Sequence, residues 1–533
     1  MRSPLAALAL ASALHACARS PTPTARGAAT LATAGLARWR GVATYDARHP
    51  TPSGASAALE RRPARFVEVV ALSPEGAALA STRTDDAGRY SLDAPAQTAF
   101  LALRADVSRD GFESRVSVDG EWSNPHEVRV PAASPGALDL HASDTAPLGP
   151  AGAFHIADSV LRGAEAVREW TGRPLPPLAV YWGRGVTTEW SYYRGERPAR
   201  SGRYMLELMG GNRGRQHTTD CDEHDEGIIL HEFGHFVMDR LSTNSSPGGS
   251  HPSGHLVDPG LAWEEGRATW LSAAVRREAR YQDTIGIEPQ GSLRVDHAIE
   301  RGDQGPRGLG AESSVIDILW DLTDGVDGYP DEDQDGVALG PAPLLRAMME
   351  LSDEPGAYPC LASFLRRITR AEGGRAPLLS PDALRDMLRR TGQPESLLTA
   401  EWPTDLAVPG QVRDRVDGLT NPSPSGGPPR GGNGFDALRV YRVHLTQRGW
   451  LRLELRIDGS GSPSDHTDVD LELRDMRGET IVASAGTSQE ERLARLLEPG
   501  WYMIYVRDGG DGARGNRASY TLRVTQRVLP PSG

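Results

Sequence analysis

The stretch DEGIILHEFGHFVMDRLS, residues 225–242, constrains the fold more than any other part of this 533-residue chain. Its apolar residues recur every four positions, which predicts a helix with one apolar face. These residues are Ile229, Phe233, Val237 and Leu241. By the same spacing, His231 and His235 leave one face of the helix, close enough to share a metal ion.

A second predicted helix, LAWEEGRATWLSAA at residues 261–274, offers Glu265 as a third ligand. Two imidazoles and one carboxylate leave a coordination position of zinc open, as catalytic sites require. Zinc held in this way lowers the pKa of a bound water to about 7. Glu232, between the two histidines, is the candidate general base for this water. A competing ligand from the intervening loop, His251 or His255, would instead favour a structural zinc site.

These residues carry a family resemblance. HEFGH followed by WEEGRATW resembles the gluzincins, metallopeptidases of the thermolysin and aminopeptidase N type. The resemblance implies that His231, His235 and Glu265 hold zinc, and that Glu232 later passes its proton to the leaving amine. It covers only these two helices. Metzincins are excluded because the Gly and third His of their longer motif are missing from this chain.

Other parts of the site are predicted less sharply. The candidate donors to a developing oxyanion are His251, His255, His297, Tyr192 and Tyr193. RYMLELMGG, residues 203–211, resembles the edge strand along which gluzincins bind an extended substrate, although an ordinary edge strand would read the same way. An aminopeptidase needs an acidic anchor for the substrate amine; the sequence does not identify one, although Glu264 and Glu207 are candidates. We therefore favour an endopeptidase.

The first residues, MRSPLAALALASALHACARS, are typical of a secretory signal, which we assign to residues 1–17. Leu14-His15-Ala16-Cys17 resembles a bacterial lipobox, which implies lipidation of Cys17; ordinary signal cleavage is the alternative. We expect an exported protein, either a cell-envelope lipoprotein or secreted, that contacts a membrane only through such an anchor. The remaining cysteines, Cys221 and Cys360, would form a disulfide or stay as two buried thiols.

Three domains are predicted after a linker at residues 18–37. Residues 38–145 alternate apolar and polar side chains, and Asp86 and Gly88 suit a hairpin turn. This segment resembles the transthyretin-like, carboxypeptidase regulatory-like β-sandwich. Residues 150–410 are mainly helical with a few strands, and we expect an α+β zincin-like catalytic domain. A linker at 411–435 precedes residues 436–530, whose strands resemble the bacterial pre-peptidase C-terminal domain, a jelly-roll-like β-sandwich.

The loop DGVDGYPDEDQDGVALG contains a candidate calcium site. Asp331, Asp333 and Asp335, followed by Gly336, reproduce the start of a calcium-binding loop, in which alternating carboxylates converge on one hard cation. The twelfth position is Ala342 rather than a bidentate Glu, so a full EF-hand is not present. The alternative is an acidic, solvated loop.

The favoured hypothesis is an exported zinc endopeptidase acting on a peptide or protein, with calcium as a candidate second cofactor. One alternative is a non-catalytic surface binding or adhesion protein with a vestigial zinc site; another is a zinc ion that only staples two helices. The net charge of −13 argues against nucleic acid as a partner.

Overall fold

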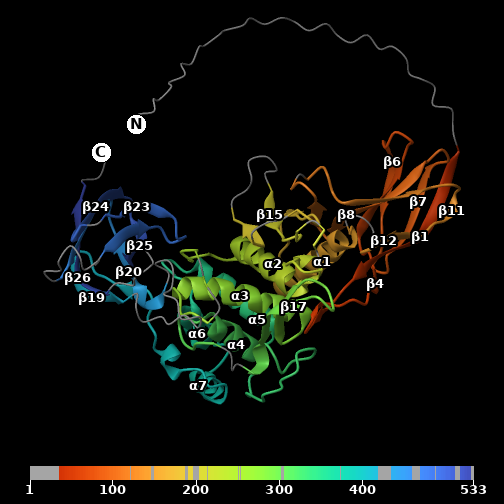
Figure 1. The fold of residues 1–533 in the computed structure, drawn as a ribbon. Helices are drawn as coiled ribbons and strands as arrows, with labels where there is room; N and C mark the ends of the chain where they lie inside the picture. Colours follow the sequence, from red (N-terminus) through yellow and green to blue (C-terminus); the bar gives the residue numbers. More distant parts are fainter. Residues whose placement is uncertain are drawn as a thin grey trace, which may run out of the picture.

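The computed structural model describes residues 35–529 with short gaps. The residues it leaves out are 1–34, 121, 146–148, 187–189, 196–202, 213, 216, 250, 252–253, 302–304, 372–373, 418–433, 459–467, 487, 510–516 and 530–533. The signal at 1–17, Cys17 and most of the two predicted linkers therefore lie outside the described residues. The N-terminal strands and the C-terminal β-sandwich lie at opposite ends of the molecule, with the helices between them (Figure 1).

The N-terminal region consists of strands. They are β1 (Leu36–Ala47), β2 (Pro50–Thr51), β3 (Gly54–Ala55), β4 (Glu60–Pro63), β5 (Val67–Leu72), β6 (Ala78–Arg83), β7 (Arg89–Pro95), β8 (Phe100–Arg109), β9 (Phe112–Ser117), β10 (Glu127–Pro131), β11 (Gly136–Ala137) and β12 (Leu140–Ala142). Alternation determines which face is buried: Tyr90, Leu92 and Ala94 of β7 point into the core.

The expected hairpin at Asp86 and Gly88 does not form. β6 pairs with β5 whereas β7 pairs with β1, so this turn crosses from one sheet to the other. Gly88 has a φ of 72°, and an added Cβ would lie 2.3 Å from the carbonyl oxygen of Ala43. A turn does form at the predicted residues, but the two strands that it joins pair with other strands and not with each other.

The middle of the chain contains most of the helices. They are α1 (Ala151–Thr171), α2 (Glu226–Leu241), α3 (Pro259–Arg276), α4 (Glu312–Asp321), α5 (Pro341–Asp353), α6 (Leu361–Thr369) and α7 (Pro381–Arg390). The short 3-10 helices are η1 (Asp222–His224), η2 (Ile299–Arg301), η3 (Glu395–Leu398) and η4 (Phe435–Ala437). The strands are β13 (Leu178–Tyr181), β14 (Tyr192–Arg194), β15 (Tyr204–Glu207), β16 (Arg280–Ile285) and β17 (Ser292–Ala298).

One eight-stranded sheet joins the N-terminal region to the middle of the chain. Its order is β14-β15-β13-β9-β8-β5-β6, with β10 also paired to β8. β9 and β13 are parallel, with Val116 opposite Val180. The sheet thus continues across the predicted boundary near residue 150, and one apolar core extends from Trp39 to Leu397.

The last region is a β-sandwich. Its strands are β18 (Thr404–Asp405), β19 (Gly410–Asp417), β20 (Leu438–Leu445), β21 (Gly449–Ile457), β22 (Val469–Arg474), β23 (Thr480–Ser484), β24 (Glu490–Leu497), β25 (Gly500–Asp508) and β26 (Arg517–Val528). The two sheets have the orders β18-β20-β25-β22-β23 and β19-β26-β21-β24. β18 pairs with β20 and β19 pairs with β26 along 410–417, so the sandwich begins at the end of the predicted domain 150–410 and includes the first part of the predicted linker 411–435.

The predicted fold class is confirmed: β-strands, then a helical α+β region, then a C-terminal β-sandwich. The sandwich also packs against the middle region. Tyr358 and Cys360 share an apolar cluster with Leu438 and Tyr505, and the hydroxyl groups of Tyr358 and Tyr505 lie 3.3 Å apart.

Candidate metal centre

Helix α2 presents the two histidines of the motif as its sequence predicts. His231 and His235 are one turn apart, and their Nε2 atoms lie 3.1 Å from each other. Ile229, Phe233 and Val237 are fully buried on the apolar face. Burial of this face holds the helix in place and leaves the imidazole face directed at α3.

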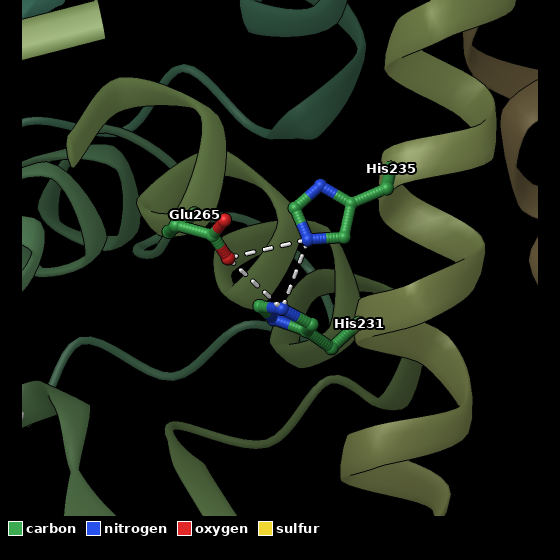
Figure 2. A group of neighbouring side chains, drawn as sticks. All are labelled: His231, His235 and Glu265. Carbon is green, nitrogen blue, oxygen red and sulfur yellow. Dashed lines mark hydrogen bonds and ion pairs between the residues drawn. The ribbon is translucent and has the colours of Figure 1, made fainter. Parts of the chain in front are cut away.

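Helix α3 brings Glu265 to the same point (Figure 2). Glu265 Oε2 lies 3.4 Å from Nε2 of His231 and 3.2 Å from Nε2 of His235. One ligand atom from each of the three residues lies within 4.8 Å of the others. Two imidazole nitrogens and a carboxylate oxygen that converge in this way fit a zinc ion, whose preferred ligands they are.

Small residues let the two helices approach closely. A Cβ added at Gly234 would lie 2.9–3.1 Å from atoms of Ala268 on α3. Asp258 caps α3, because Oδ1 accepts the backbone N–H groups of Gly260 and Leu261. The close approach places Glu265 within reach of both histidines.

The second ring nitrogen of each histidine also has a partner. Nδ1 of His231 lies 2.9 Å from Oγ1 of Thr269, and Nδ1 of His235 lies 3.5 Å from Oε1 of Glu264. If each Nε2 bound a metal ion, each Nδ1 would carry the ring proton and donate a hydrogen bond to its oxygen partner, which would fix the orientation of the ring. Arg267 forms an ion pair with Glu264 from the same helix.

These supporting residues were not all recognised from the sequence. Thr269 stands four positions after Glu265 in a predicted helix, a spacing that could have revealed it. Glu264, considered as an anchor for a substrate amine, is instead a buried partner of His235 and Arg267. Although burial raises the pKa of Glu264, Arg267 and His235 lower it overall.

The carboxylates around His235 give the centre negative charge that favours a bound cation. Burial opposes protonation of His235, but the negative charge of Glu265 and the contact with Glu264 raise its pKa well above the ordinary value. Glu232 is buried on α2 and adds to this negative charge around His235. Its role as general base stays a prediction.

Among the candidate oxyanion donors, His251 contacts the ligand triad. Its Nε2 lies 3.5 Å from Oε1 of Glu265, and its Nδ1 lies 3.5 Å from Oε2 of Glu312 on α4. His251 is not one of the converging group of ligand atoms. Three other candidates form side-chain hydrogen bonds outside the triad. Tyr192 contacts Glu207, Tyr193 contacts Asp239, and His297 contacts Asp317. His255 is buried in the loop before α3.

The predicted edge strand is not at an edge. β15 pairs with β13 on one side and with β14 on the other, so β14 forms this end of the sheet among the described residues. The tyrosine hydroxyl of Tyr193 donates to Asp239, which places β14 beside the C-terminal half of α2. Glu207, at the end of β15, is paired with Arg194.

Of the two alternatives for Cys221 and Cys360, a disulfide or two free thiols, the structure shows the free thiols. Cys221 and Cys360 are both reduced, and each thiol contacts its own local partners. Cys221 Sγ donates to the carbonyl oxygen of Thr219 at 3.3 Å, whereas Cys360 caps α6 and lies 3.6 Å from Oγ of Ser363. Burial raises the pKa of both thiols, so neither is activated as a thiolate.

The structure changes the predicted calcium group. Asp331 and Asp333 converge with Glu300, one carboxylate oxygen from each lying within 4.8 Å of the others. Asp335 is not part of this set; its Oδ1 accepts the backbone N–H of Val337. A second acidic group, missed from the sequence, consists of Asp220, Asp222 and Asp283 near the start of α2.

Comparison with known proteins gives a partial match. Residues 177–344, less than half of the chain, match the family described as the mycolysin C-terminal domain. This span contains α2, α3 and α4, and therefore the whole ligand triad. No curated protein matches the sequence.

Three of the solved structures that the chain resembles each match about a quarter of it. One is the pre-peptidase C-terminal domain of a collagenase from Bacillus anthracis, with 13% identity, 24% of this chain and 97% of that chain covered, and a TM-score of 0.17. Another is a periplasmic inhibitor of g-type lysozyme from Aeromonas hydrophila, with 15% identity, 23% and 98% coverage, and a TM-score of 0.15. A β-1,3-glucan-binding module from Bacillus halodurans has 12% identity, 22% and 98% coverage, and a TM-score of 0.15.

TM-scores this low carry no argument about fold or function, so the resemblances to two named β-sandwich families stay predictions. Within the part of the chain that the structure describes, no helix is long and apolar enough to cross a membrane.

Proposed function

We propose that this chain is a zinc-dependent metallopeptidase. The observation that carries the proposal is the convergence of His231 Nε2, His235 Nε2 and Glu265 Oε2, with Glu232 beside them on α2. The matched mycolysin C-terminal domain, named after a metallopeptidase, spans both helices and supports the same conclusion.

Zinc held by His231, His235 and Glu265 would supply Lewis-acid activation of a water molecule. Glu232 accepts a proton from the attacking water and returns it to the leaving amine. His251 is positioned beside the ligands to donate a hydrogen bond to the oxyanion that develops on the scissile carbonyl.

An extended peptide is the substrate that the sheet supports best. β14 offers backbone hydrogen-bonding groups at the end of the sheet, beside α2, so a peptide could add there as a further strand. The two candidate anchors for a substrate amine, Glu264 and Glu207, are already paired with Arg267 and Arg194. This pairing favours an endopeptidase over an aminopeptidase.

We place this activity outside the cytoplasm, because the first residues are typical of a secretory signal. If Cys17 is lipidated, the mature protein should partition into the detergent phase. A secreted protein without the lipid should stay in the aqueous phase.

The proposal is tested with zinc content and hydrolysis of casein, with and without chelator. Wild type should hold one zinc and show chelator-sensitive activity. Glu232→Gln should keep the zinc and lose about 10²- to 10⁴-fold in rate, because the positioned base is gone. Glu169→Gln, an exposed change of the same charge on α1, is the control and should behave as wild type.

Zinc in both proteins without hydrolysis of any peptide would favour a binding or structural role. Absence of zinc from wild type would refute the assignment of the ligands.

A further inference from the structure

The structure contains an acidic cavity away from the zinc ligands. Its volume is about 330 Å³, and it is lined by Glu300, Asp317, Asp321, Glu332, Asp333, Arg390 and Thr391. These residues come from η2, from α4, from the loop after α4 and from the end of α7 and the residue that follows it. The lining is therefore assembled from three neighbouring segments of the chain and from the more distant end of α7.

Three carboxylate oxygens of α4 and the segment after it are buried without a partner among the described residues. They are Oδ2 of Asp321, Oδ1 of Asp324 and Oδ2 of Asp335. Asp321 is 4% exposed and lines the cavity, and the other two are buried as deeply. Burying a carboxylate oxygen that accepts no hydrogen bond costs free energy unless a cation or a proton compensates its charge.

Protonation would be the alternative to a cation. Burial, with repulsion from Glu300 and Asp335, raises the pKa of Asp324 to about 10. Burial likewise raises the pKa of Asp321 well above its ordinary value.

The fixed cations at the cavity are few. Nη1 of Arg390 donates to the carbonyl oxygen of Gln334 at 3.2 Å. Arg307 and His297 approach Asp317 at 3.8 and 3.3 Å. Five carboxylates and one guanidinium line the cavity, so negative charge predominates there.

From these observations we propose that Glu300 and Asp333, which line the cavity, bind a calcium ion together with Asp331. One oxygen from each lies within 4.8 Å of the others, a separation that one cation can bridge. Glu300 is held in place because Oε1 accepts the N–H groups of Glu332 and Asp333 at 2.7 and 3.1 Å. Its Oε2 accepts the indole N–H of Trp320.

The donor set selects calcium. All candidate ligands are oxygens, which suit a hard cation, and no thiolate or imidazole belongs to the group. Calcium accepts six to eight oxygens in flexible geometry, which carboxylates and waters in an open cavity can supply. Magnesium requires a smaller, near-octahedral arrangement, which a cavity of this size does not impose.

The ion would fasten the segment after α4 to the helix that carries Glu265. The hydroxyl of Tyr329 donates to the carbonyl oxygen of Ala274 on α3 at 2.9 Å. The indole N–H of Trp270, also on α3, donates to Oγ1 of Thr323 at 2.8 Å. Calcium would thus stabilise α3 from the side opposite the zinc ligands, whether or not the protein hydrolyses peptides.

Terbium luminescence tests the proposal in the full chain. Terbium replaces calcium, and Trp320, bonded to Glu300, lies close enough to transfer excitation to it. After chelation and restoration of one equivalent of zinc, wild type should show saturable luminescence that calcium displaces. Calcium at about 100-fold over its Kd should raise Tm by roughly 3–4 °C, whereas equal magnesium should not.

The double variant Asp331→Asn, Asp333→Asn should lose at least about tenfold in terbium affinity and most of the calcium effect on Tm. The matched control is Asp327→Asn combined with Asp353→Asn, two exposed changes that remove the same charge, which should behave as wild type. Asp331 and Asp333 are both at the surface, so the double variant is expected to fold.

Wild-type protein without saturable luminescence or a calcium effect on Tm would overturn the proposal. Unchanged terbium affinity in the double variant, or an equal effect of magnesium, would also overturn it. Glu232→Gln protein should keep the full calcium response, which separates this outcome from failure of the peptidase proposal.

Discussion

Replacement of Thr269 by Val tests how the zinc ligands are oriented. Thr269 is buried, and its Oγ1 lies 2.9 Å from Nδ1 of His231. Valine has nearly the same shape but cannot accept the proton of Nδ1. With Nε2 on the metal, this N–H would be left buried without a partner, which costs about 1–3 kcal/mol.

The metal-free protein escapes this cost, because its imidazole can move the proton to Nε2. The penalty therefore falls on the zinc-bound state alone. A cost in this range corresponds to a zinc affinity about 10- to 100-fold weaker, the usual effect of losing such a partner. Competition with a fluorescent chelator measures the zinc Kd directly.

Ser272→Ala is the matched control. Ser272 is also buried on α3, and its Oγ donates to the carbonyl oxygen of Gly227 on α2 at 2.8 Å. Its loss should lower stability by about 1 kcal/mol and leave the zinc Kd unchanged. If Thr269→Val binds zinc within about twofold of wild type, or if Ser272→Ala weakens zinc equally, this account of His231 is refuted.

Three further results are expected. Gly234→Ala should cost about 1–3 kcal/mol in the free energy of unfolding and weaken zinc, because its Cβ would press on Ala268; a normal denaturation midpoint would contradict the close approach. His251→Ala should lower kcat about 10²-fold with zinc content unchanged, whereas loss of zinc would identify His251 as a ligand. Burial raises the pKa of Asp258 to about 6, so the folded protein favours the protonated acid. Its stabilising contribution is full below the unfolded pKa near 3.8 and is lost as pH rises through 6, at most about 3 kcal/mol. Asp258→Asn keeps a capping oxygen and should remove this pH dependence from Tm; parallel curves for the two proteins would argue against it.

The ligand triad could be predicted because its signals are local. His231 and His235 share one helix face by spacing alone, and Glu265 follows in the next helix. The alternation in β21 likewise predicts its buried face, with Leu451, Leu453 and Leu455 inside.

Features that depend on distant pairing could not be predicted in this way. Nothing in the β15 segment indicates that β14 covers it, because strand order depends on partners elsewhere in the chain. Glu300 joins Asp331 and Asp333 only after η2 folds against the loop. Whether Cys221 and Cys360 form a disulfide could not be predicted either, because the number of cysteines does not give the distance between them in the fold.

The parallel pairing of β9 with β13 has a consequence for maturation. The N-terminal region supplies strands to the interior of a sheet that continues into the middle of the chain. A protease that cut the connection after β12 would produce two fragments that remain associated, since they share both the sheet and the core. We therefore expect the nicked protein to migrate as one species under native conditions and as two only after denaturation. The residues from β1 to β12 would accompany the zinc centre throughout the life of the protein.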